Sequence, residues 1–433
     1  MYGGVAVSAL GCPDPFAEVP AHPCTLLADG PLTTTLRRAV RVGQRKGSRQ
    51  RLRDALDRLP PAPTGDLLPG ESSGASAFVG APALAAVLRV ATTNAPDDIA
   101  ADYRQRFEEA DARLDLIVRD RLWAAYRRLD ERTGPARAEF SVREGLAGLG
   151  LCLLQRPGPD PLLANVVECF VELVLSGRGE PRPGWWVHDS PCHDLSERKE
   201  WPHGHADLSL PDGSAGILAL LALARSQGVS VYGLDVAMRT VVEWYRAHQR
   251  TDETGYAWWP DVVTDPEPDS APELHLRQAN HSAPGWCGTL GIARSLQLAG
   301  IALGDDELCE TAVDAACTAL MRDTHEFFWG GLCHGPQGAA LIAKRMFRDA
   351  GGPFSDAAVG ELRTALDWKA LPTTPRGGLL DGAVGVQVSQ TPDKSETVLP
   401  SPGTAQWDSL LGVAAPRPAS RAVPARPLLG ESA

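Results

Sequence analysis

A glycine-spaced repeat constrains this chain more than any other feature of its sequence. The pattern Gly-x-x-Gly, followed by small and apolar residues, begins at Gly145, Gly213, Gly288, Gly335 and Gly382. A degenerate copy begins at Gly80 and precedes the apolar run 84–90. Successive first glycines are 65, 68, 75, 47 and 47 residues apart, which leaves room for two helices and their connections in each copy.

Each copy predicts one buried helix and one outer helix. The run 217–224 is apolar on every side, as in a helix that is buried all round, whereas 235–249 mixes polar and apolar residues. One long helix is expected over 95–132, with acidic residues early and arginines late. Strand signals are scarce, and the best β-branched run, 229–232, is short. The sequence therefore predicts an all-α fold, an α/α toroid with six inner and six outer helices in a double ring.

The repeat also predicts where a functional site lies. If all inner helices begin at the same end of the ring, the residues just before the first glycines meet there. In five of the six copies that residue is titratable or able to bind a metal: Glu144, Asp212, Cys287, His334 and Asp381. The degenerate copy has Val79 in this place. A purely structural repeat has no need of such residues, so this rim is the predicted site.

Three side chains at the rim form a candidate metal set. Cys287 and the adjacent pair Cys333 and His334 supply two thiols and an imidazole. Three such ligands leave one position of a tetrahedral zinc open for substrate, which is the pattern of catalytic rather than structural zinc. We therefore predict Zn²⁺ bound by Cys287, Cys333 and His334.

Composition excludes several classes of protein. The formal net charge of −12 argues against a general nucleic-acid binder. No apolar run reaches the ~18 residues that a membrane span needs, and residues 1–20 lack the pattern of a signal peptide. The nine scattered cysteines suit a cytosolic chain without a disulfide framework. We expect a cytoplasmic protein.

The predicted domain organisation has three parts. Residues 1–60 form a Pro/Gly-rich N-terminus and a basic arm, 61–413 the toroid, and 414–433 a disordered tail rich in Pro, Ala and Arg. The segment from Arg37 to Arg58 holds nine positive charges against two negative ones. It is either a solvated helix or flexible arm, or a docking surface for an acidic peptide or partner protein.

Several motifs at and beyond the rim carry a family resemblance. They are Trp286-Cys287-Gly288, Cys333-His334-Gly335, Leu379-Leu380-Asp381-Gly382 and Trp407-Asp408-Ser409-Leu410-Leu411, together with the repeated Gly-x-x-Gly helices. Over roughly residues 70–413 the chain resembles the lanthionine synthetase C family, the cyclases of lanthipeptide biosynthesis. The Trp-Cys motif is one residue shorter here than in the family. The resemblance implies an α/α toroid with Cys287, Cys333 and His334 as zinc ligands.

The resemblance implies a thioether-forming reaction. A partner enzyme, of dehydratase or kinase type, dehydrates Ser and Thr in a ribosomally made precursor peptide. The cyclase then adds a peptide Cys to the dehydrated residue, and zinc favours the thiolate that acts as nucleophile. The resulting enolate must be protonated, so a general acid and a positive group near the enolate oxygen help.

Three positions depart from the family pattern. Asp212 stands where the family usually has His, Ser141 where it has Asp, and Ala283 where it has Arg. The metal set is kept while the expected acid–base and enolate-stabilising groups are replaced. Asp212 is a candidate to move a proton, although Asp is also a preferred helix N-cap. The alternative function is a catalytically altered zinc-binding toroid that binds a precursor peptide or scaffolds a lanthipeptide-modifying complex.

Other residues carry weaker signals. His281 and His205 are each more typical of a surface or structural histidine. Cys192-His193 and His203-Gly204-His205 resemble a second metal set only loosely, and Trp185, Trp186 and Trp201 either pack or form a peptide-contacting wall. Another toroid enzyme, of prenyltransferase or glycan-processing type, needs a carboxylate ligand or a carboxylate pair. Neither explains Trp-Cys together with Cys-His-Gly.

Overall fold

The computed structural model describes residues 25–43, 46–188, 203–253, 255, 257–264, 285–321, 331–333, 335–350, 378–389 and 407–414. Six inner helices follow the repeat, and each begins one residue after the first glycine of its copy. They are α4 (Ala81–Asn94), α8 (Leu146–Leu153), α10 (Ser214–Ser226), α13 (Thr289–Leu303), α15 (Pro336–Ala350) and α17 (Ala383–Ser389). The predicted repeat is therefore a repeat of helices.

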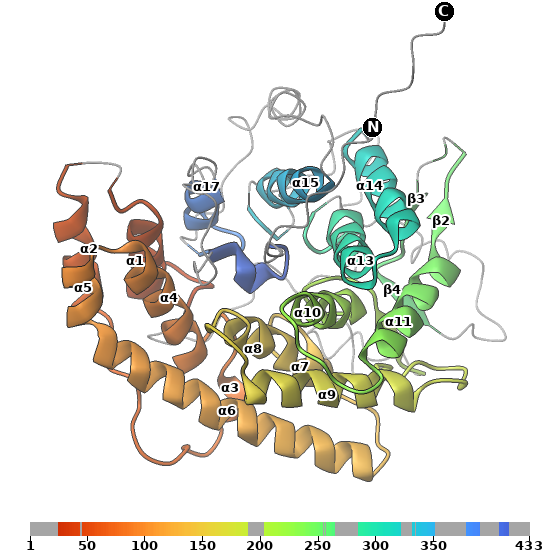
Figure 1. Cartoon of the computed structure of the whole chain (residues 1–433), viewed down its shortest axis with the longest axis horizontal. Coiled ribbons are helices and arrows are strands. Elements are labelled where there is room, and N and C mark those ends of the chain that lie inside the picture. The colour runs from red at the N-terminus through yellow and green to blue at the C-terminus, as the bar shows by residue number, and fades with distance from the viewer. Residues whose placement is uncertain are drawn as a thin grey trace, which may run out of the picture.

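The inner helices pack in sequence order around a ring (Figure 1). Every residue of α8 is buried, as are residues 214–224 of α10 and 289–300 of α13. Helices that are apolar on all sides find no water-facing side, so they form the inner layer. Other helices cover them from outside: α6 (Arg104–Asp130), α9 (Pro161–Ser176), α11 (Leu234–His248) and α14 (Asp306–Met321).

Helix α11 shows why these helices are outer ones. It buries Leu234, Ala237, Met238, Val241, Val242 and Tyr245, a spacing of three and four residues that forms one apolar stripe. Helix α6 follows the short α5 (Asp97–Asp102), and the two are separated at Tyr103. The single helix predicted over 95–132 is therefore two helices.

In the five complete copies, the second glycine allows a close contact within the junction. A Cβ at Gly148 would lie 1.9 Å from the carbonyl oxygen of Val142, and one at Gly338 would lie 1.8 Å from that of Leu332. No real Cβ approaches an oxygen so closely, so both positions require glycine. The same contact with a preceding carbonyl recurs at Gly216, Gly291 and Gly385. The Gly-x-x-Gly spacing thus has a packing cause, independent of any chemistry at the rim.

The beginning of the described chain closes the ring. Helix α1 (Pro31–Val40) packs on both α4 and α17, the first and last inner helices. Before it, the Leu26 amide donates to the Phe78 carbonyl (2.8 Å), and the Leu379 amide donates to the Leu26 carbonyl (2.7 Å). Residue 26 therefore joins the first and sixth repeats through the main chain.

The basic segment is partly built into this closure. Helix α1 buries Leu32 and Leu36, and α2 (Ser48–Leu56) packs on α1. Arg37 and Arg41 donate to Gln387 on α17, at 3.1 and 2.9 Å. These contacts show folded helices in place of a flexible arm over the described part of the segment. A docking role for it, and the boundary at residue 60, stay predictions.

The end of the described chain lies across the middle of the ring. The 3₁₀ helix η4 (Trp407–Leu411) packs on α4 and α8 (Figure 1). From the other side, the Trp286 indole donates to the Leu411 carbonyl (2.9 Å), and Arg345 Nε donates to Asp408 Oδ2 (2.8 Å). The closing motif found in the sequence thus ties opposite sides of the ring together.

The remaining elements are short. Helices α3 (Glu71–Gly74) and α7 (Arg137–Phe140) lie beside α6 and α8, respectively. Strand β1 (His205–Asp207) pairs antiparallel with β4 (Val262–Thr264), and β2 (Arg250–Thr251) pairs with β3 (Ala257–Trp258). The run 229–232 forms no strand, which corrects the best strand signal in the sequence.

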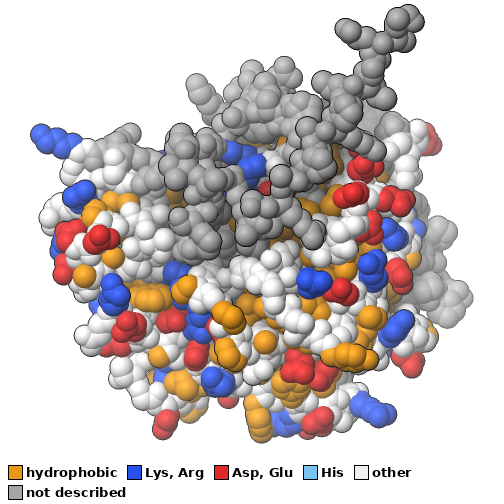
Figure 2. Space-filling view, in the orientation of Figure 1, with side chains coloured by type: hydrophobic (Ala, Val, Ile, Leu, Met, Phe, Trp, Pro, Cys, Tyr) orange, Lys and Arg blue, Asp and Glu red, His pale blue; other side chains and the backbone are white. Residues whose placement is uncertain are grey.

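The described surface carries both signs of charge. On the face shown in Figure 2, basic and acidic side chains are interspersed over the described residues. Among these residues, no helix is long and apolar enough to cross a membrane.

Candidate functional site

The loops that open the inner helices are joined to one another by main-chain hydrogen bonds. The amides of Val142 and Arg143 donate to the Pro211 carbonyl, at 2.9 and 3.0 Å. The Cys333 amide donates to the Leu380 carbonyl (3.0 Å), and the Cys287 amide donates to the Cys333 carbonyl (3.4 Å). Neighbouring junctions therefore lie side by side at one end of the ring, as the repeat predicts.

Two of the predicted metal ligands face each other at this rim. The sulfur atoms of Cys287 and Cys333 are 2.9 Å apart, and neither cysteine forms a disulfide. Cys333 is buried and Cys287 is half-buried. A disulfide has a sulfur separation of about 2.05 Å, so these are two thiols directed at one point.

The third predicted ligand, His334, lies outside the described residues. Among the described residues, no group of three His, Cys, Asp or Glu side chains is placed to hold a metal. The donors that are described fit zinc: two thiols from separate loops supply two ligands of a tetrahedral N/S site. The chain order places His334 directly after one of them.

Asp212 is buried at the start of the third repeat. The residue at the N-cap of α10 is Gly213, and the helix has no side-chain cap. The Asp212 carboxylate instead accepts two hydrogen bonds from Arg143, one from Nε to Oδ1 at 3.0 Å and a shorter one from Nη2 to Oδ2. The N-cap interpretation of Asp212 is therefore wrong. A bidentate ion pair holds this carboxylate between the second and third repeats.

Sequence reasoning missed Arg143. The signal was its position: it lies two residues before Gly145, the place that Cys333 occupies before Gly335. The departure at Ser141 has a local explanation, because its buried hydroxyl accepts a hydrogen bond from the Glu144 amide (3.1 Å). Ala283 lies outside the described residues.

Two buried titratable side chains lie on β1, where the Asp207 carbonyl accepts a hydrogen bond from Ser214 at the start of α10 (3.4 Å). His205 is 1% exposed, and burial, helped by the positive charge of Arg137, lowers its pKa to about 4. Asp207 is also buried, which raises the pKa of its carboxyl, and its Oδ1 accepts from the Ser209 amide (2.7 Å). The burial of His205 fits the structural role expected of it.

Other candidates from the sequence are placed as follows. Trp185 and Trp186 are both buried, and the Trp186 indole donates to the His203 carbonyl (3.0 Å), so these two rings pack rather than line a peptide wall. His281, Cys192, His193 and Trp201 lie outside the described residues.

Comparisons with known proteins agree with this architecture. The family model described as lanthionine synthetase C-like protein matches residues 32–387. The nisin biosynthesis protein NisC of Lactococcus lactis subsp. lactis is 23% identical over 247 residues, covering 55% of this chain and 56% of that protein. The aligned part thus spans little more than half of this curated relative.

A solved structure named nisin cyclase matches with a TM-score of 0.69 at 18% sequence identity, covering 90% of this chain and 92% of that chain. At this identity the likeness shows the fold, and it confirms the predicted α/α toroid. The family match covers most of the sequence and includes the repeats from α4 to α17. The chain therefore belongs to the lanthionine synthetase C-like family.

Proposed function

We propose that this protein is a lanthipeptide cyclase, which adds peptide Cys thiols to dehydrated Ser and Thr residues of a ribosomally made precursor peptide. The observation that carries the proposal is the pair of sulfur atoms of Cys287 and Cys333, 2.9 Å apart at the rim. Membership of the family supports the reaction class. The names of the relatives, nisin biosynthesis protein and nisin cyclase, agree with it.

The proposed cofactor is Zn²⁺, held by Cys287, Cys333 and His334. Cys287 begins the fourth repeat and Cys333 the fifth, so the ring itself brings the two thiols together. When bound, zinc would favour the thiolate form of the incoming peptide Cys. Cys287 is half-buried, so its side chain is not closed off completely by the described residues.

Asp212 is the proposed proton carrier. It stands at the start of α10, which packs directly on α13, the helix that Cys287 precedes. The contact is close at the rim, because the Leu210 side chain lies 3.1 Å from the Cβ position of Gly291. A carboxylate in this place supports proton transfer without the histidine that the family usually has.

The proposed setting follows from the substrate. The precursor must reach this protein already dehydrated, so we propose that it works beside a dehydratase or kinase-type modifying enzyme in the cytoplasm. The exposed arginines of the basic segment, such as Arg49 and Arg58, are the proposed contact for a negatively charged peptide or partner.

The activity is tested with a synthetic peptide that contains one Cys and one dehydroalanine. Ring closure leaves the peptide mass unchanged and removes one thiol, so alkylation followed by mass spectrometry counts the reaction. Wild-type protein with zinc should consume the thiol, and Cys287→Ala should not. Cys309→Ala is the matched control, because Cys309 is half-buried on α14 away from the rim junctions. A zinc-loaded wild-type protein that leaves the thiol intact would contradict the proposal.

The second candidate function is a zinc-binding scaffold without turnover. Two observations favour it: Arg143 binds Asp212, and Ser141 is hydrogen-bonded within its own turn. In that case the protein should capture the dehydrated peptide without closing it. Binding that survives Cys287→Ala and Cys333→Ala, measured by calorimetry, together with intact thiols, would favour the scaffold.

A further inference from the structure

The ion pair of Arg143 and Asp212 joins two repeats at the rim. Two guanidinium nitrogens contact the two carboxylate oxygens, and the side chains are only 14% and 6% exposed. The main chain fixes this geometry, because the amides of Val142 and Arg143 both donate to the carbonyl of Pro211, the residue before Asp212. The pair is therefore held from both sides and does not depend on a flexible loop.

Arg143 and Asp212 occupy the same positions within their repeats as the two cysteines do within theirs. Asp212 directly precedes the first glycine of its copy, as Cys287 does, and Arg143 lies two residues before its glycine, as Cys333 does. One pair of neighbouring copies thus brings two sulfurs together, and another pair brings a cation and an anion together. The two pairs occupy equivalent levels of the ring, at the starts of inner helices.

We infer that Arg143 is a positioning residue that keeps Asp212 as a carboxylate, so that Asp212 enters the reaction as the acceptor of the thiol proton. This inference rests on the proposed function. A guanidinium in contact with both oxygens favours the charged carboxyl and fixes its orientation. Lysine, as a point charge, would keep the first effect and weaken the second.

The proton then completes a balanced reaction. The S–H bond of the peptide Cys breaks and its proton moves to Asp212. The sulfur electron pair forms the S–C bond at the β-carbon of the dehydro residue, and the former C=C pair becomes an enolate. Asp212 returns the proton to the α-carbon, which restores the carboxylate and its pair with Arg143. Nothing is oxidised or reduced, and no co-reactant is needed.

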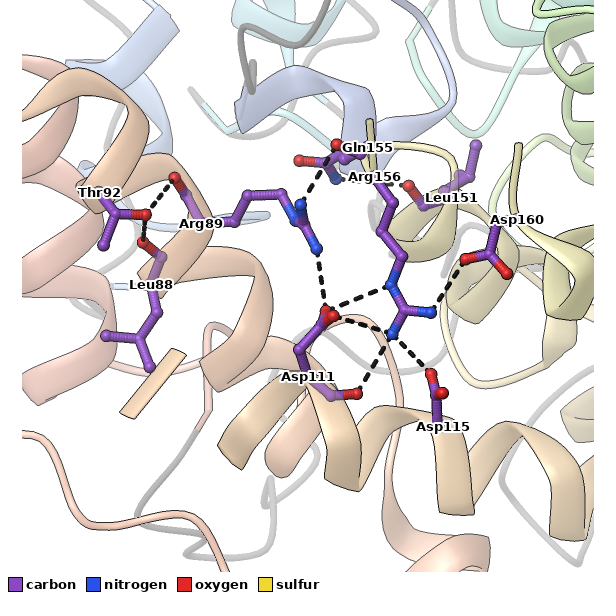
Figure 3. A network of polar contacts seen from close by, with 9 residues as sticks. All are labelled: Leu88, Arg89, Thr92, Asp111, Asp115, Leu151, Gln155, Arg156 and Asp160. Carbon is purple, nitrogen blue, oxygen red and sulfur yellow. Dashed lines mark hydrogen bonds and ion pairs between the residues drawn. The ribbon is translucent and has the colours of Figure 1, made fainter. Parts of the chain in front are cut away.

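A purely structural role is the alternative, and Arg156 provides the comparison. Arg156 is exposed to a similar degree, 15%, and binds Asp111, Asp115 and Asp160 away from the rim (Figure 3). If Arg143 only supports the fold, the two arginines should behave alike on substitution. If it positions Asp212, they should differ in the rate of ring closure by folded protein.

The experiment compares wild type with Arg143→Lys, Arg143→Met, the charge-swapped pair R143D/D212R, and Arg156→Met as control. The readouts are kcat and KM for ring closure of the Cys–dehydroalanine peptide, bound zinc, and the urea midpoint of unfolding. We expect Arg143→Met to lower kcat about 100-fold, with KM within about twofold and zinc unchanged. Arg143→Lys should recover part of kcat, and the swapped pair should restore the midpoint without restoring kcat.

Three results would overturn the inference. One is that R143D/D212R restores kcat together with the urea midpoint. A purely structural ion pair should work equally well when its two charges are exchanged. Another is an unchanged kcat in folded Arg143→Met. The third is a wild type that closes no ring, which overturns the proposed function as well. If wild type is active and kcat is unchanged in folded Arg143→Met, the role of Arg143 is refuted while the proposed function stands.

Discussion

The two ends of helix α8 carry an arginine each, in opposite settings. Arg143 lies three residues before the helix begins and Arg156 three residues after it ends. Arg143 binds the Asp212 carboxylate at the rim, where the thiols of Cys287 and Cys333 also meet. Arg156 binds three carboxylates, two within α6 and one at the N-cap of α9.

The network around Arg156 holds three helices together (Figure 3). Asp111 and Asp115 come from α6 and Asp160 from the start of α9, and Asp111 also accepts from Arg89 on α4 (2.9 Å). Burial alone would lower the pKa of Arg156, but these carboxylates outweigh burial and raise it. The arginine that follows α8 is thus surrounded by carboxylates.

The difference between Arg143 and Arg156 shows that the two ends of α8 have different roles. At the far end of α8, Arg156 has three carboxylate partners, and these ion pairs connect it to the outer helices α6 and α9. At the rim, Arg143 pairs with Asp212 and Cys287 meets Cys333, each pair from neighbouring copies. Substitutions at the rim should therefore change ring closure, and substitutions at the far end should change stability.

The largest effect is expected from Cys333→Ala. Loss of one proposed ligand should reduce bound zinc and slow ring closure about a thousand-fold or more, which corresponds to ~4 kcal/mol of transition-state stabilisation. Cys333 is small, so the free energy of unfolding without metal should change little. Zinc analysis, the thiol assay and urea unfolding of the metal-free protein measure the three effects. Retained zinc with full activity would remove Cys333 from the proposed site.

The next largest effect is expected from Arg156→Met. Removal of the cation leaves three carboxylates around a partly buried position and should lower the free energy of unfolding by about 3 kcal/mol, near the low end for buried pairs because the side chain is 15% exposed. The rate of ring closure per folded molecule should stay unchanged. Arg225→Met is the control, because its pair with Asp235 is exposed and should contribute less than about 0.5 kcal/mol. A slower rate in folded Arg156→Met would break the distinction between the two ends.

The sequence predicted what is local to each repeat. All six inner helices begin directly after the first glycine of a copy. In the five complete copies, a close backbone contact also requires glycine at the second position, as at Gly148, so the motif marks each of these helix starts in the sequence. The meeting of Cys287 and Cys333 followed from the same register. Periodicity alone could therefore establish the inner layer and the place of the rim.

Contacts between distant segments could not be read in this way. The closure through Leu26 joins residues more than 350 positions apart by main-chain bonds, which leave no mark in side-chain periodicity. The bond of Trp286 to Leu411 and the pair of Arg143 with Asp212 likewise depend on how repeats stack. The run 229–232 shows the converse: β-branched residues form no strand there, because they connect α10 to α11 without a partner strand.

A pH-dependent effect is expected from His205 on β1. His205 has its pKa lowered to about 4, so the folded protein keeps the imidazole neutral while the unfolded chain protonates it near pH 6.5. Between these values the unfolded state binds more protons, and stability therefore falls as the pH drops from about 6.5 to about 4. The raised pKa of Asp207 makes the folded state bind a proton more readily, so it adds stability as the pH falls and offsets part of the His205 effect. The net loss of stability should therefore be about 2 kcal/mol.

Urea unfolding between pH 7 and pH 4 measures this slope. His205→Gln should flatten it, since the variant has no group to titrate at this position, whereas the exposed His203→Asn should leave it as in wild type. Equal slopes in wild type and His205→Gln would mean that other groups control acid stability.

The smallest effect separates two roles of Asp160 at the far end of α8. Its Oδ1 accepts from the amides of Leu162 (2.8 Å) and Leu163 (3.3 Å) as the N-cap of α9, and its Oδ2 binds Arg156 (2.9 Å). Asp160→Ala should cost about 1 kcal/mol through loss of the cap. Asp160→Asn keeps a cap acceptor and leaves Arg156 with Asp111 and Asp115. It should therefore lower the free energy of unfolding by only a few tenths of a kcal/mol. Urea midpoints measure both variants, and equal losses would mean that the ion pair, and not the cap, is what Asp160 contributes.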